Sequence, residues 1–466
     1  MRRTTCTTRL RRLILAAVLV LAAAAAGGAL LPATAAAGVP GKTSAILQKN
    51  GFGGSLTGVV IWDFSAGRLV YELNKDVMLA PASNMKLVTS LSALNTWGPD
   101  HCFKTELYGP DAEVSADGVL TGDLYLKGYG DPSLSTRDYQ RREFGFRTAS
   151  FESFAKRLKT LKVRKVKGRV VGDETYFDDL RDGPTWTPNL QLESGTLSAL
   201  TGNESVDNGR RVKQPALYAA LLMTRALEAR GIKVTGGPGV GVVPDTARLY
   251  KQQFSAPLRT LLKRMDKNSD NFFAEIVTKG FGKQQLDSGS TQAGVEVSRR
   301  TLDAIGIDPA SYVLVDGSGL SYSNRLTAAD LARVIGAARQ RADSDVLYDA
   351  LAIAGVDGTL AWRMEHTKAE DNARGKTGTL NISTCLTGYV TSANKHVVGY
   401  AIMLGGDPVD YWRGEAAQDD LVVMLARSRL TGRKGARISP TTRQIPVGAS
   451  AAVNPAGGFL EPVVQP

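Results

Sequence analysis

Apolar residues recur at two different spacings along this chain, and these spacings predict strands near both of its ends with helices between them. Near the N-terminus, Leu56–Phe64 and Arg68–Leu73 are predicted as two strands of a hairpin. Near the C-terminus, three more strands are predicted at Lys376–Leu386, Gly388–Ser392 and His396–Leu404. Helical spacing predicts helices at residues 44–49, 81–97, 215–230, 256–267, 271–279 and 415–428. We therefore expect an α/β (α+β) fold, in which the N- and C-terminal strands pair in one antiparallel sheet flanked by helices.

The middle of the chain differs from both ends. Residues 104–211 carry short β-like runs and turn clusters, which indicate an inserted β-rich second domain. The domain that contains the N- and C-terminal strands is then split into residues 38–103 and 212–430. Residues 431–466 are rich in Pro, Gly, Ser and Thr without periodicity, so we expect a disordered tail.

The first 37 residues have the layout of a secretory signal peptide. Five arginines and no acidic residue precede an apolar run over residues 13–31, and small residues follow at 33–38. Cleavage is expected around residues 35–37, with an uncleaved membrane anchor as the alternative. Either way the body of the protein is expected to be exported and to be secreted, in the cell wall or in the periplasm.

Composition and charge exclude several classes of function. The chain has 466 residues with 57 Lys+Arg against 45 Asp+Glu, a formal charge of +12. Without the five arginines of the signal, 52 basic residues face the same 45 acidic ones, so the charge falls to +7 and we expect no nucleic acid partner. Three isolated histidines give no metal site, and we expect no cofactor. Cys102 and Cys385 remain in an oxidising compartment, and whether they pair stays open.

The predicted helix at residue 81 begins with a candidate nucleophile. Ser83 and Lys86 form an S-x-x-K, and positions i and i+3 share a helix face. A serine hydroxyl needs a neighbour that takes its proton, and a lysine can do so when burial and a nearby cation keep its amine neutral. An S-x-x-K alone is common by chance.

Two further motifs make a chance origin improbable. Ser269, Asp270 and Asn271 form S-D-N, and we expect an extended loop there with Ser269 and Asn271 on one side and Asp270 on the other. Residues 376–379 form K-T-G-T in a predicted strand, whose alternation separates the side of residues 376 and 378 from that of residues 377 and 379. S-x-x-K, S-x-N and K-T-G in this order are the signature of serine penicillin-binding proteins and serine β-lactamases.

The chain resembles one branch of these enzymes, the D-Ala-D-Ala carboxypeptidase/endopeptidase family of low-molecular-mass class C penicillin-binding proteins (peptidase family S13, DacB-like). Secondary motifs carry the resemblance beside the three main ones: G-D-P-S-L at residues 130–134, G-R-V-V-G-D at 168–173 and D-G-S-G-L-S at 316–321. The family's last motif usually continues with Arg, whereas Tyr322 follows here, which leaves stem-peptide specificity open.

The resemblance implies a substrate and a role for each motif residue. The substrate is the peptide stem of peptidoglycan, β-lactams are inhibitors, and endopeptidase activity is left open beside carboxypeptidase activity. Ser83 is the implied nucleophile, Lys86 the general base and Ser269 the proton relay. Backbone N–H groups of Ser83 and Thr379 are the expected oxyanion hole. The implied substrate-binding residues are Asn271, Lys376, Thr377, Gly378, Thr379 and Asp173.

Two other functions remain as alternatives. A serine β-lactamase or esterase of the same fold differs in its rate of deacylation, and a catalytically silent wall-binding protein would not need all of the motif residues. Residues 156–169 contain eight basic residues in fourteen. They suggest weak association with anionic cell-wall polymers or a membrane surface, although a solvated face is the preferred interpretation.

Overall fold

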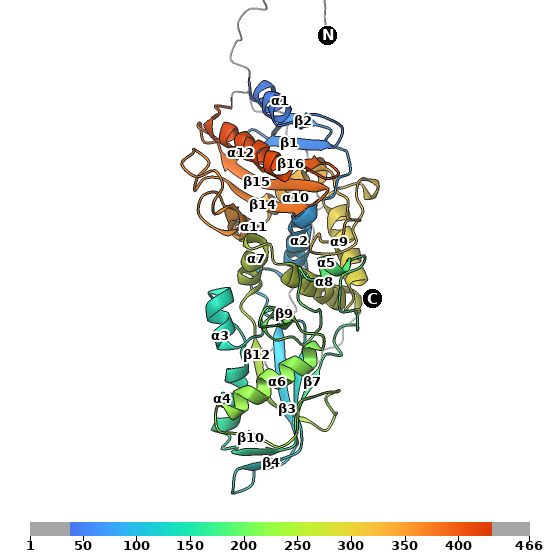
Figure 1. The fold of residues 1–466 in the computed structure, drawn as a ribbon, viewed down its shortest axis with the longest axis vertical. Coiled ribbons are helices and arrows are strands. Elements are labelled where there is room, and N and C mark those ends of the chain that lie inside the picture. The colour runs from blue at the N-terminus through green and yellow to red at the C-terminus, as the bar shows by residue number, and fades with distance from the viewer. Residues whose placement is uncertain (1–37, 431–466) are drawn as a thin grey trace, which may run out of the picture.

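The computed structural model describes residues 38–430, so the predicted signal peptide (1–37) and disordered tail (431–466) lie outside the described residues. The molecule is elongated, with an upper and a lower body stacked along its long axis (Figure 1). The upper body contains both ends of the described chain, and the lower body is built from the segment between them. No helix of residues 38–430 is both long and apolar enough to cross a membrane.

The upper body is built on one antiparallel sheet. Its strand order is β13-β14-β15-β16-β1-β2. The strands are β1 (Thr57–Asp63), β2 (Arg68–Leu73), β13 (Ala352–Ile353), β14 (Arg374–Leu380), β15 (Ser383–Thr391) and β16 (Val397–Gly405). β1 and β16 are antiparallel neighbours, with Thr57 opposite Leu404. The predicted pairing of the N- and C-terminal strands is therefore confirmed.

One predicted strand boundary is wrong. We expected a break near residue 387, but the turn lies at residues 381–382, between β14 and β15. β15 is buried at eight of its nine positions, so both of its faces are covered. A strand that is buried on both faces does not alternate between apolar and polar residues, so alternation could not locate its ends.

Helices cover both faces of this sheet. Val60 of β1 packs into one apolar core with α2, α8 and α10, whereas its neighbours Val59 and Ile61 pack into another with α1 and α12. Successive side chains of a strand point to opposite faces, so a single strand joins the two cores. The helical elements of the upper body are α1 (Val39–Lys49), η1 (Ala82–Asn84), α2 (Met85–Trp97), α7 (Leu258–Lys267), α8 (Asn271–Leu286), α9 (Thr291–Ala304), η4 (Pro309–Ser311), α10 (Ala328–Gln340), α11 (Ser344–Ala350), η5 (Gly358–Leu360) and α12 (Tyr411–Arg427).

The lower body has its own sheets and apolar core. A five-stranded sheet has the order β11-β7-β5-β3-β12, and a three-stranded sheet the order β10-β6-β4. The strands are β3 (Lys104–Gly109), β4 (Val119–Thr121), β5 (Leu124–Gly128), β6 (Lys165–Lys167), β7 (Val170–Asp173), β8 (Val206–Asp207), β9 (Arg210–Arg211), β10 (Lys233–Val234), β11 (Gly239–Val240) and β12 (Arg248–Phe254). The helical elements are α3 (Arg137–Tyr139), η2 (Gln140–Phe144), α4 (Phe151–Thr160), η3 (Asn203–Ser205) and α6 (Pro215–Glu228). The short helix α5 (Pro188–Gln191) comes from the same stretch of chain but lies beside α8 and α9 of the upper body (Figure 1).

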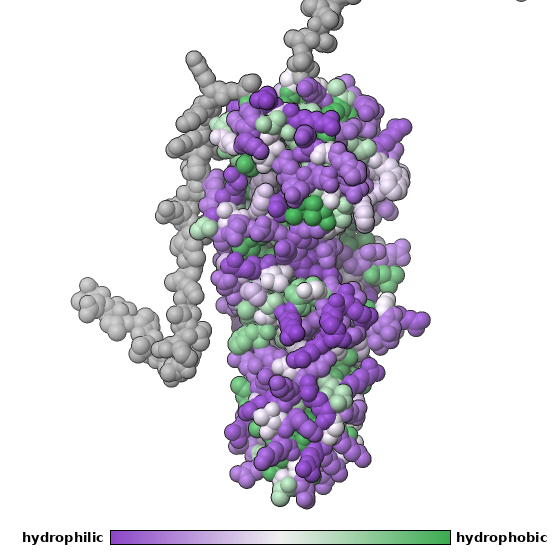
Figure 2. Space-filling model, turned by 90° about the vertical axis from the view of Figure 1, so that its left-hand side faces the viewer, coloured by the Kyte–Doolittle hydropathy of each residue, from purple (hydrophilic) through white to green (hydrophobic). Residues whose placement is uncertain are grey.

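The lower body extends beyond the predicted insert boundary at residue 211. α6 contributes Ala219 and Met223 to the lower core, and β12 pairs with β3 in the five-stranded sheet. The helical spacing of residues 215–230 could not place this boundary, because periodicity shows that a helix is amphipathic but not which core it covers. The face of the molecule drawn in Figure 2 is predominantly hydrophilic over both bodies.

The two cysteines do not pair. Cys102 is half-buried and Cys385 is buried in β15, and both are free thiols. Burial raises the pKa of Cys385 to about 12, so its thiol stays protonated and inert.

Candidate active site

Ser83 sits at the start of the helix that the sequence predicted. It is the middle residue of the short helix η1, which leads directly into α2. Ala82 has a φ of 46°, in the left-handed region that alanine seldom adopts. Gly319 packs on this turn so closely that a Cβ there would lie 1.9 Å from the Ala82 carbonyl oxygen. The turn is therefore fixed from both sides, and it leaves Ser83 half-exposed between buried neighbours.

Lys86 lies one turn further along and is fully buried. Its Nζ is 3.0 Å from Ser83 Oγ, as the i, i+3 spacing predicted. The same amine donates to Asn271 Oδ1 at 2.6 Å and to the Ser318 carbonyl at 2.7 Å. Burial lowers the pKa of Lys86 from 10.5 to about 8, although nearby carboxylates, Asp316 foremost, oppose the shift. The amine is therefore poised to lose its proton near neutral pH.

The S-D-N motif connects two helices, α7 and α8. Ser269 has a φ of 58°, so the expected extended loop is wrong. Asp270 caps α8 by accepting the N–H of Phe273 at 3.0 Å, and its other oxygen accepts from Arg264 Nε at 3.0 Å. Capping favours a sharp entry into the helix over an extended approach. Asn271 is the first residue of α8, and the helix directs its amide to Lys86.

The Ser269 hydroxyl makes no hydrogen bond to another residue in the part of the chain that the structure describes. It is half-buried, and its sequence neighbour Asn271 reaches Lys86.

The K-T-G motif lies on β14 against the turn of Ser83. A Cβ on Gly378 would lie 2.8 Å from the Pro81 carbonyl oxygen and 3.0 Å from Ser83 N, so only glycine allows this approach. Residues 376 and 378 are buried, while Thr377 is half-buried and Thr379 exposed, which confirms the predicted alternation. The Thr377 hydroxyl donates to Thr359 Oγ1 at 2.7 Å.

Lys376 is buried behind this surface. Its Nζ donates to the Thr377 carbonyl at 2.9 Å. Burial first and the charge of Lys86 second lower the pKa of Lys376 to about 7. Asp266 is the buried carboxyl that opposes this shift, and it accepts from Ser90 Oγ at 2.7 Å. The charge of Lys86 therefore favours the neutral form of Lys376.

A buried carboxyl that sequence analysis missed supports Lys86. Glu275 of α8 accepts the N–H groups of Gly317 at 3.0 Å and of Ser318 at 2.7 Å through Oε1. It thereby holds the Ser318 carbonyl that binds Lys86. Burial raises the pKa of Glu275 to about 8. A single acidic residue within the apolar run of residues 272–277 was the available signal, because an acid in a buried helix usually has a specific partner.

A segment of the predicted insert also reaches the site. Asn271 Nδ2 donates to the Glu193 carbonyl at 2.8 Å. Trp186 Nε1 donates to Asp316 Oδ2 at 2.9 Å, and Asp316 in turn accepts the N–H of Gly319 at 2.8 Å. The segment around residues 185–193 is therefore bonded to the loop that closes on Ser83. In the sequence, the D-G-S-G-L-S segment of residues 316–321 supports the family resemblance but predicts no role for these residues.

The structure corrects the assignment of Asp173. This residue ends β7 in the lower body and its side chain is fully buried. Its Oδ2 pairs with Lys127 Nζ at 3.2 Å and accepts the N–H of Val243 at 2.9 Å, and its Oδ1 accepts from Thr175 Oγ1 at 2.6 Å. A carboxylate enclosed by these partners has no free acceptor for a substrate, so Asp173 holds the end of β7 instead.

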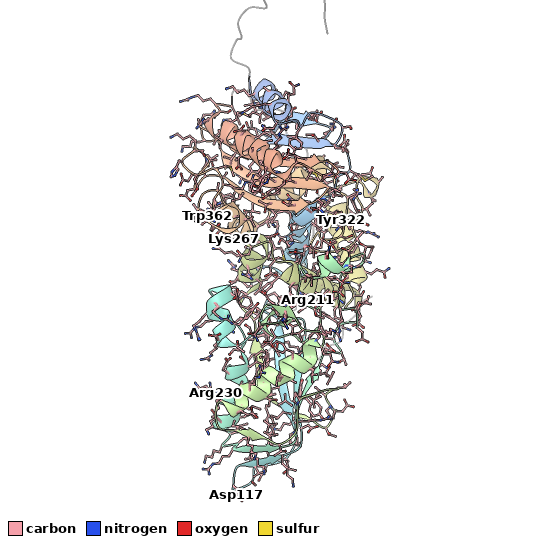
Figure 3. The ribbon with its side chains drawn as sticks, in the orientation of Figure 1. Asp117, Arg211, Arg230, Lys267, Tyr322 and Trp362 are labelled. Carbon is pink, nitrogen blue, oxygen red and sulfur yellow. The ribbon has the colours of Figure 1, made fainter. Side chains whose placement is uncertain are left out.

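Tyr322 lies beside the end of the K-T-G strand. Its ring packs on the small apolar cluster of Ala80, Ala82 and Leu380, and its hydroxyl is 3.5 Å from the backbone nitrogen of Asn381. Figure 3 places it in the upper body, on the opposite side from Trp362. It is therefore a neighbour of both Ser83 and β14.

Known proteins are similar to this chain in sequence and in architecture. The model of the D-Ala-D-Ala carboxypeptidase 3 (S13) family matches residues 40–195 and 190–428. D-alanyl-D-alanine carboxypeptidase from Actinomadura sp. (strain R39) is 30% identical over 428 residues, which cover 74% of this chain and 77% of that protein. Carboxypeptidase DacB from Mycolicibacterium smegmatis is 30% identical over 363 residues, which cover 75% of this chain and 76% of that protein.

A solved structure agrees in fold. The crystal structure of penicillin binding protein 4 (dacB) from Haemophilus influenzae has a TM-score of 0.68 with 22% sequence identity, and it covers 81% of this chain and 97% of that chain. The same protein has also been solved in complex with a β-lactam, at a TM-score of 0.62 and 21% identity, covering 81% of this chain and 97% of that chain. With a family match over nearly the whole described chain, the protein belongs to the D-Ala-D-Ala carboxypeptidase 3 (S13) family, as its three motifs predicted.

Proposed function

We propose that Ser83 is the nucleophile with which this serine-type D-Ala-D-Ala carboxypeptidase cleaves peptidoglycan stem peptides. The observation that carries the proposal is the 3.0 Å contact between Ser83 Oγ and the buried amine of Lys86, whose pKa is lowered to about 8. Such a pair meets the two requirements of a serine nucleophile, a base within hydrogen-bond reach and a pKa near the working pH.

The proton inventory of Lys86 supports its role as general base. A neutral amine has two N–H donors and one lone pair. Asn271 Oδ1 and the Ser318 carbonyl accept the two donors, which leaves the lone pair directed at Ser83 Oγ. Lys86 then takes the Ser83 proton as Oγ bonds to the carbonyl carbon of the penultimate D-Ala.

The remaining steps of acylation use the groups around Ser83. The developing oxyanion is bound by the backbone N–H groups of Ser83 and Thr379, a role supported by the close approach of Gly378 to Ser83 N. The tetrahedral intermediate collapses as the bond to the terminal D-Ala breaks, and the departing amine receives a proton through Ser269. Water then hydrolyses the ester and Ser83 regains its proton.

The K-T-G strand is proposed to bind the terminal carboxylate of the substrate. Thr379 is the exposed residue of this strand, so its hydroxyl is available to the ligand. The half-buried Thr377 hydroxyl donates to Thr359 and would turn its proton to the carboxylate when substrate binds. Lys376 supplies positive charge from behind, and Asn271 contacts the substrate backbone. β-Lactams carry a carboxylate and a reactive carbonyl in a similar relation, so they acylate Ser83 and inhibit the enzyme.

Several finer assignments belong to the same proposal. The upper body is the catalytic domain and the lower body the inserted domain. D,D-endopeptidase activity accompanies carboxypeptidase activity, and the protein acts outside the cytoplasm after export. The basic residues of α4 and β6, which include Lys156 and Lys165, add a weak attraction to anionic wall polymers.

The test uses two substrates and one active-site variant. The mature protein is incubated with a stem pentapeptide and separately with a fluorescent penicillin, as wild type and as Ser83→Ala. Release of D-Ala together with a long-lived adduct that Ser83→Ala abolishes supports the proposal. Ser44→Ala, a substitution in α1, is the matched control and retains both activities.

The other outcomes separate the alternatives. Rapid turnover of the penicillin without a stable adduct would indicate a β-lactamase. Absence of labelling and of D-Ala release in a folded protein would indicate a wall-binding protein without catalysis.

A further inference from the structure

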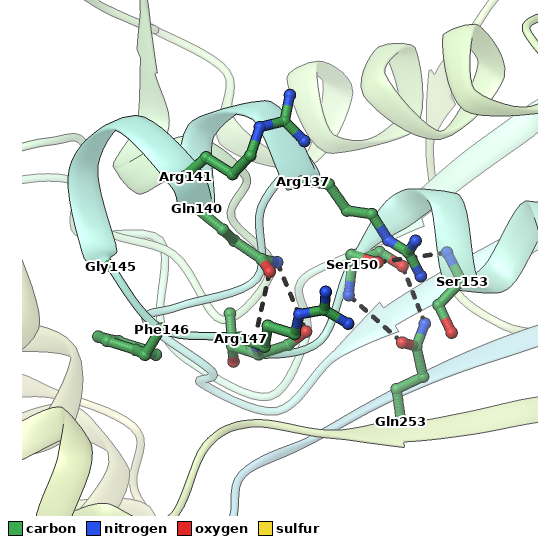
Figure 4. Close-up of a pocket in the computed structure, with 10 residues that line it drawn as sticks. Arg137, Gln140, Arg141, Gly145, Phe146, Arg147, Ser150, Ser153 and Gln253 are labelled. Atoms are coloured by element: carbon green, nitrogen blue, oxygen red, sulfur yellow. Dashed lines mark hydrogen bonds between the residues drawn. The ribbon is translucent and has the colours of Figure 1, made fainter.

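A cavity of about 560 Å³ lies in the lower body, apart from Ser83. It opens between the segment of α3 and η2, the start of α4 and strand β12 (Figure 4). Three arginines line it, Arg137, Arg141 and Arg147, and no lining residue is acidic. A concave site with this lining has the electrostatics of an anion-binding pocket.

Within residues 38–430, two of these arginines have no counter-ion from the protein. Arg141 pairs with Asp138 at 3.0 Å. The guanidinium groups of Arg137 and Arg147 form no hydrogen bond or ion pair within residues 38–430, and both residues are among those that line the cavity in Figure 4. Glu152 accepts the backbone N–H of Arg137 at 3.0 Å, not its side chain. Both arginines are exposed and line one cavity, so an oxyanion bound there would gain two charge-assisted partners.

The other polar groups of the pocket are already bonded to the protein. Gln140 Nε2 donates to the Ala149 carbonyl at 3.0 Å. Gln253 accepts the N–H of Ser150 at 3.3 Å and donates to its carbonyl at 3.0 Å. These amides hold the walls in place, so the arginines are the groups left to recognise a ligand. A ligand recognised by these arginines would be an anion, and a planar carboxylate suits the fork of a guanidinium.

The wall of the pocket rests on the catalytic machinery. Arg264 Nη1 donates to the Glu143 carbonyl at 2.9 Å, and its Nε donates to Asp270 at 3.0 Å. The ring of Phe144 packs edge-on against Phe273 with centroids 5.7 Å apart. The segment that lines the pocket is thus fixed to the first turn of α8, which also presents Asn271 to Lys86.

We propose that this pocket binds a carboxylate of a second stem peptide on the same peptidoglycan strand whose reacting stem occupies the Ser83 site. The inference rests on the proposed function, because that function makes a repeating, carboxylate-bearing polymer the substrate. A strand held at two places stays bound while one stem is processed, and the second contact raises the effective concentration of the others. An isolated stem peptide occupies only the Ser83 site and gains nothing from the pocket.

The test compares a polymer with a monomer. The substrates are soluble uncrosslinked glycan strands with pentapeptide stems, freed of phosphodiester polymers, and the isolated pentapeptide. The variant Arg137→Gln/Arg147→Gln removes the two unpaired charges, and Arg225→Gln/Arg248→Gln removes two exposed charges of the lower body outside the pocket. We expect kcat/KM on strands to fall roughly tenfold in the pocket variant, mainly through KM, and kcat/KM on the pentapeptide to stay within about twofold.

The controls make each outcome informative. No loss on strands, an equal loss on the pentapeptide, or an equal loss in the Arg225/Arg248 control overturns the proposal. A loss seen only with strands that retain phosphodiester polymers also overturns it and identifies a phosphate site.

A binding assay is independent of catalysis. Co-sedimentation of the Ser83→Ala protein with purified peptidoglycan is measured with and without Arg137→Gln/Arg147→Gln, and the pocket variant is expected to bind less. Failure of the wild type to release D-Ala would count against the proposed function alone, whereas unchanged sedimentation would count against the pocket.

Discussion

Asn271 Oδ1 lies 2.6 Å from Lys86 Nζ, although the two residues are 185 positions apart in the chain. The contact joins the S-D-N and S-x-x-K motifs through a neutral amide. A neutral acceptor binds the amine in either protonation state, whereas a carboxylate there would stabilise the charged form.

The variant Asn271→Asp tests this arrangement. The new carboxylate is expected to raise the pKa of Lys86, so less of the base is neutral at pH 7 and acylation by a fluorescent penicillin falls roughly tenfold to hundredfold. The rising limb of the pH profile should shift to higher pH, because Lys86 of this variant loses its proton only above pH 8. Asn271→Ala loses the contact without adding charge, so its rate should fall without an alkaline shift. An Asn271→Asp profile parallel to that of wild type would contradict the assignment of Lys86 as base.

The two site lysines predict a bell-shaped pH profile. Acylation needs neutral Lys86, so the rate rises toward pH 8, and it needs charged Lys376, so the rate falls above pH 7. The maximum acylation rate is expected near pH 7.5. Because Lys86 and Lys376 interact, the pKa values read from the two limbs of the profile describe the pair and not either lysine alone. Arginine stays charged at every pH of the assay, so Lys376→Arg should lose the alkaline limb. Melting curves establish that this variant is folded, and persistence of the limb would show that it belongs to another group.

Gly378→Ala is expected to damage both stability and acylation. Its Cβ would meet the Pro81 carbonyl oxygen and Ser83 N at distances of 2.8 and 3.0 Å, and neither backbone atom can yield as a flexible side chain would. Overpacking of this kind costs about 1–3 kcal/mol of unfolding free energy. Urea unfolding and the acylation rate measure the two effects. Gly54→Ala meets no atom within 4 Å and should change neither.

Trp186→Phe tests the bond between the segment of residues 185–193 and the loop of Asp316. The substitution removes the indole N–H that Asp316 Oδ2 accepts and leaves a buried acceptor short of one donor. We expect a loss of about 1–3 kcal/mol in the free energy of unfolding, measured in urea. Trp412 is 77% exposed, so Trp412→Phe should stay within about 0.5 kcal/mol of wild type. Equal free energies of unfolding for the two variants would show that the hydrogen bond from Trp186 to Asp316 does not stabilise the fold.

Sequence reasoning located the chemistry better than its surroundings. Ser83 and Lys86 followed from a spacing that is local to one helix turn, and the burial pattern of β14 followed from alternation within one strand. Both depend on a few consecutive residues, which a sequence displays directly.

Long-range packing was not accessible in this way. The left-handed backbone of Ser269 is imposed by the junction of two helices, and the Ser318 carbonyl reaches Lys86 across 232 positions. Asp173 belongs to a motif that implied substrate binding, but its carboxylate is bound by Lys127 and Thr175. The conformation or role of each of these residues depends on the residues that the fold places beside it. Those neighbours are distant in the sequence, or they form contacts that no local pattern predicts.

The shortness of β13 has a consequence for how a substrate is held. β13 pairs only with Arg374 and Gly375, so within the described chain the outer side of β14 has no strand partner from Lys376 onward. An extended peptide laid along that side would become a seventh strand, bound through its own backbone N–H and C=O groups. Binding through backbone groups does not depend on most side chains of the peptide. Selectivity among stem peptides would therefore have to come from contacts with the ends of the peptide. In such an enzyme the sheet would gain its seventh strand only while a substrate is bound.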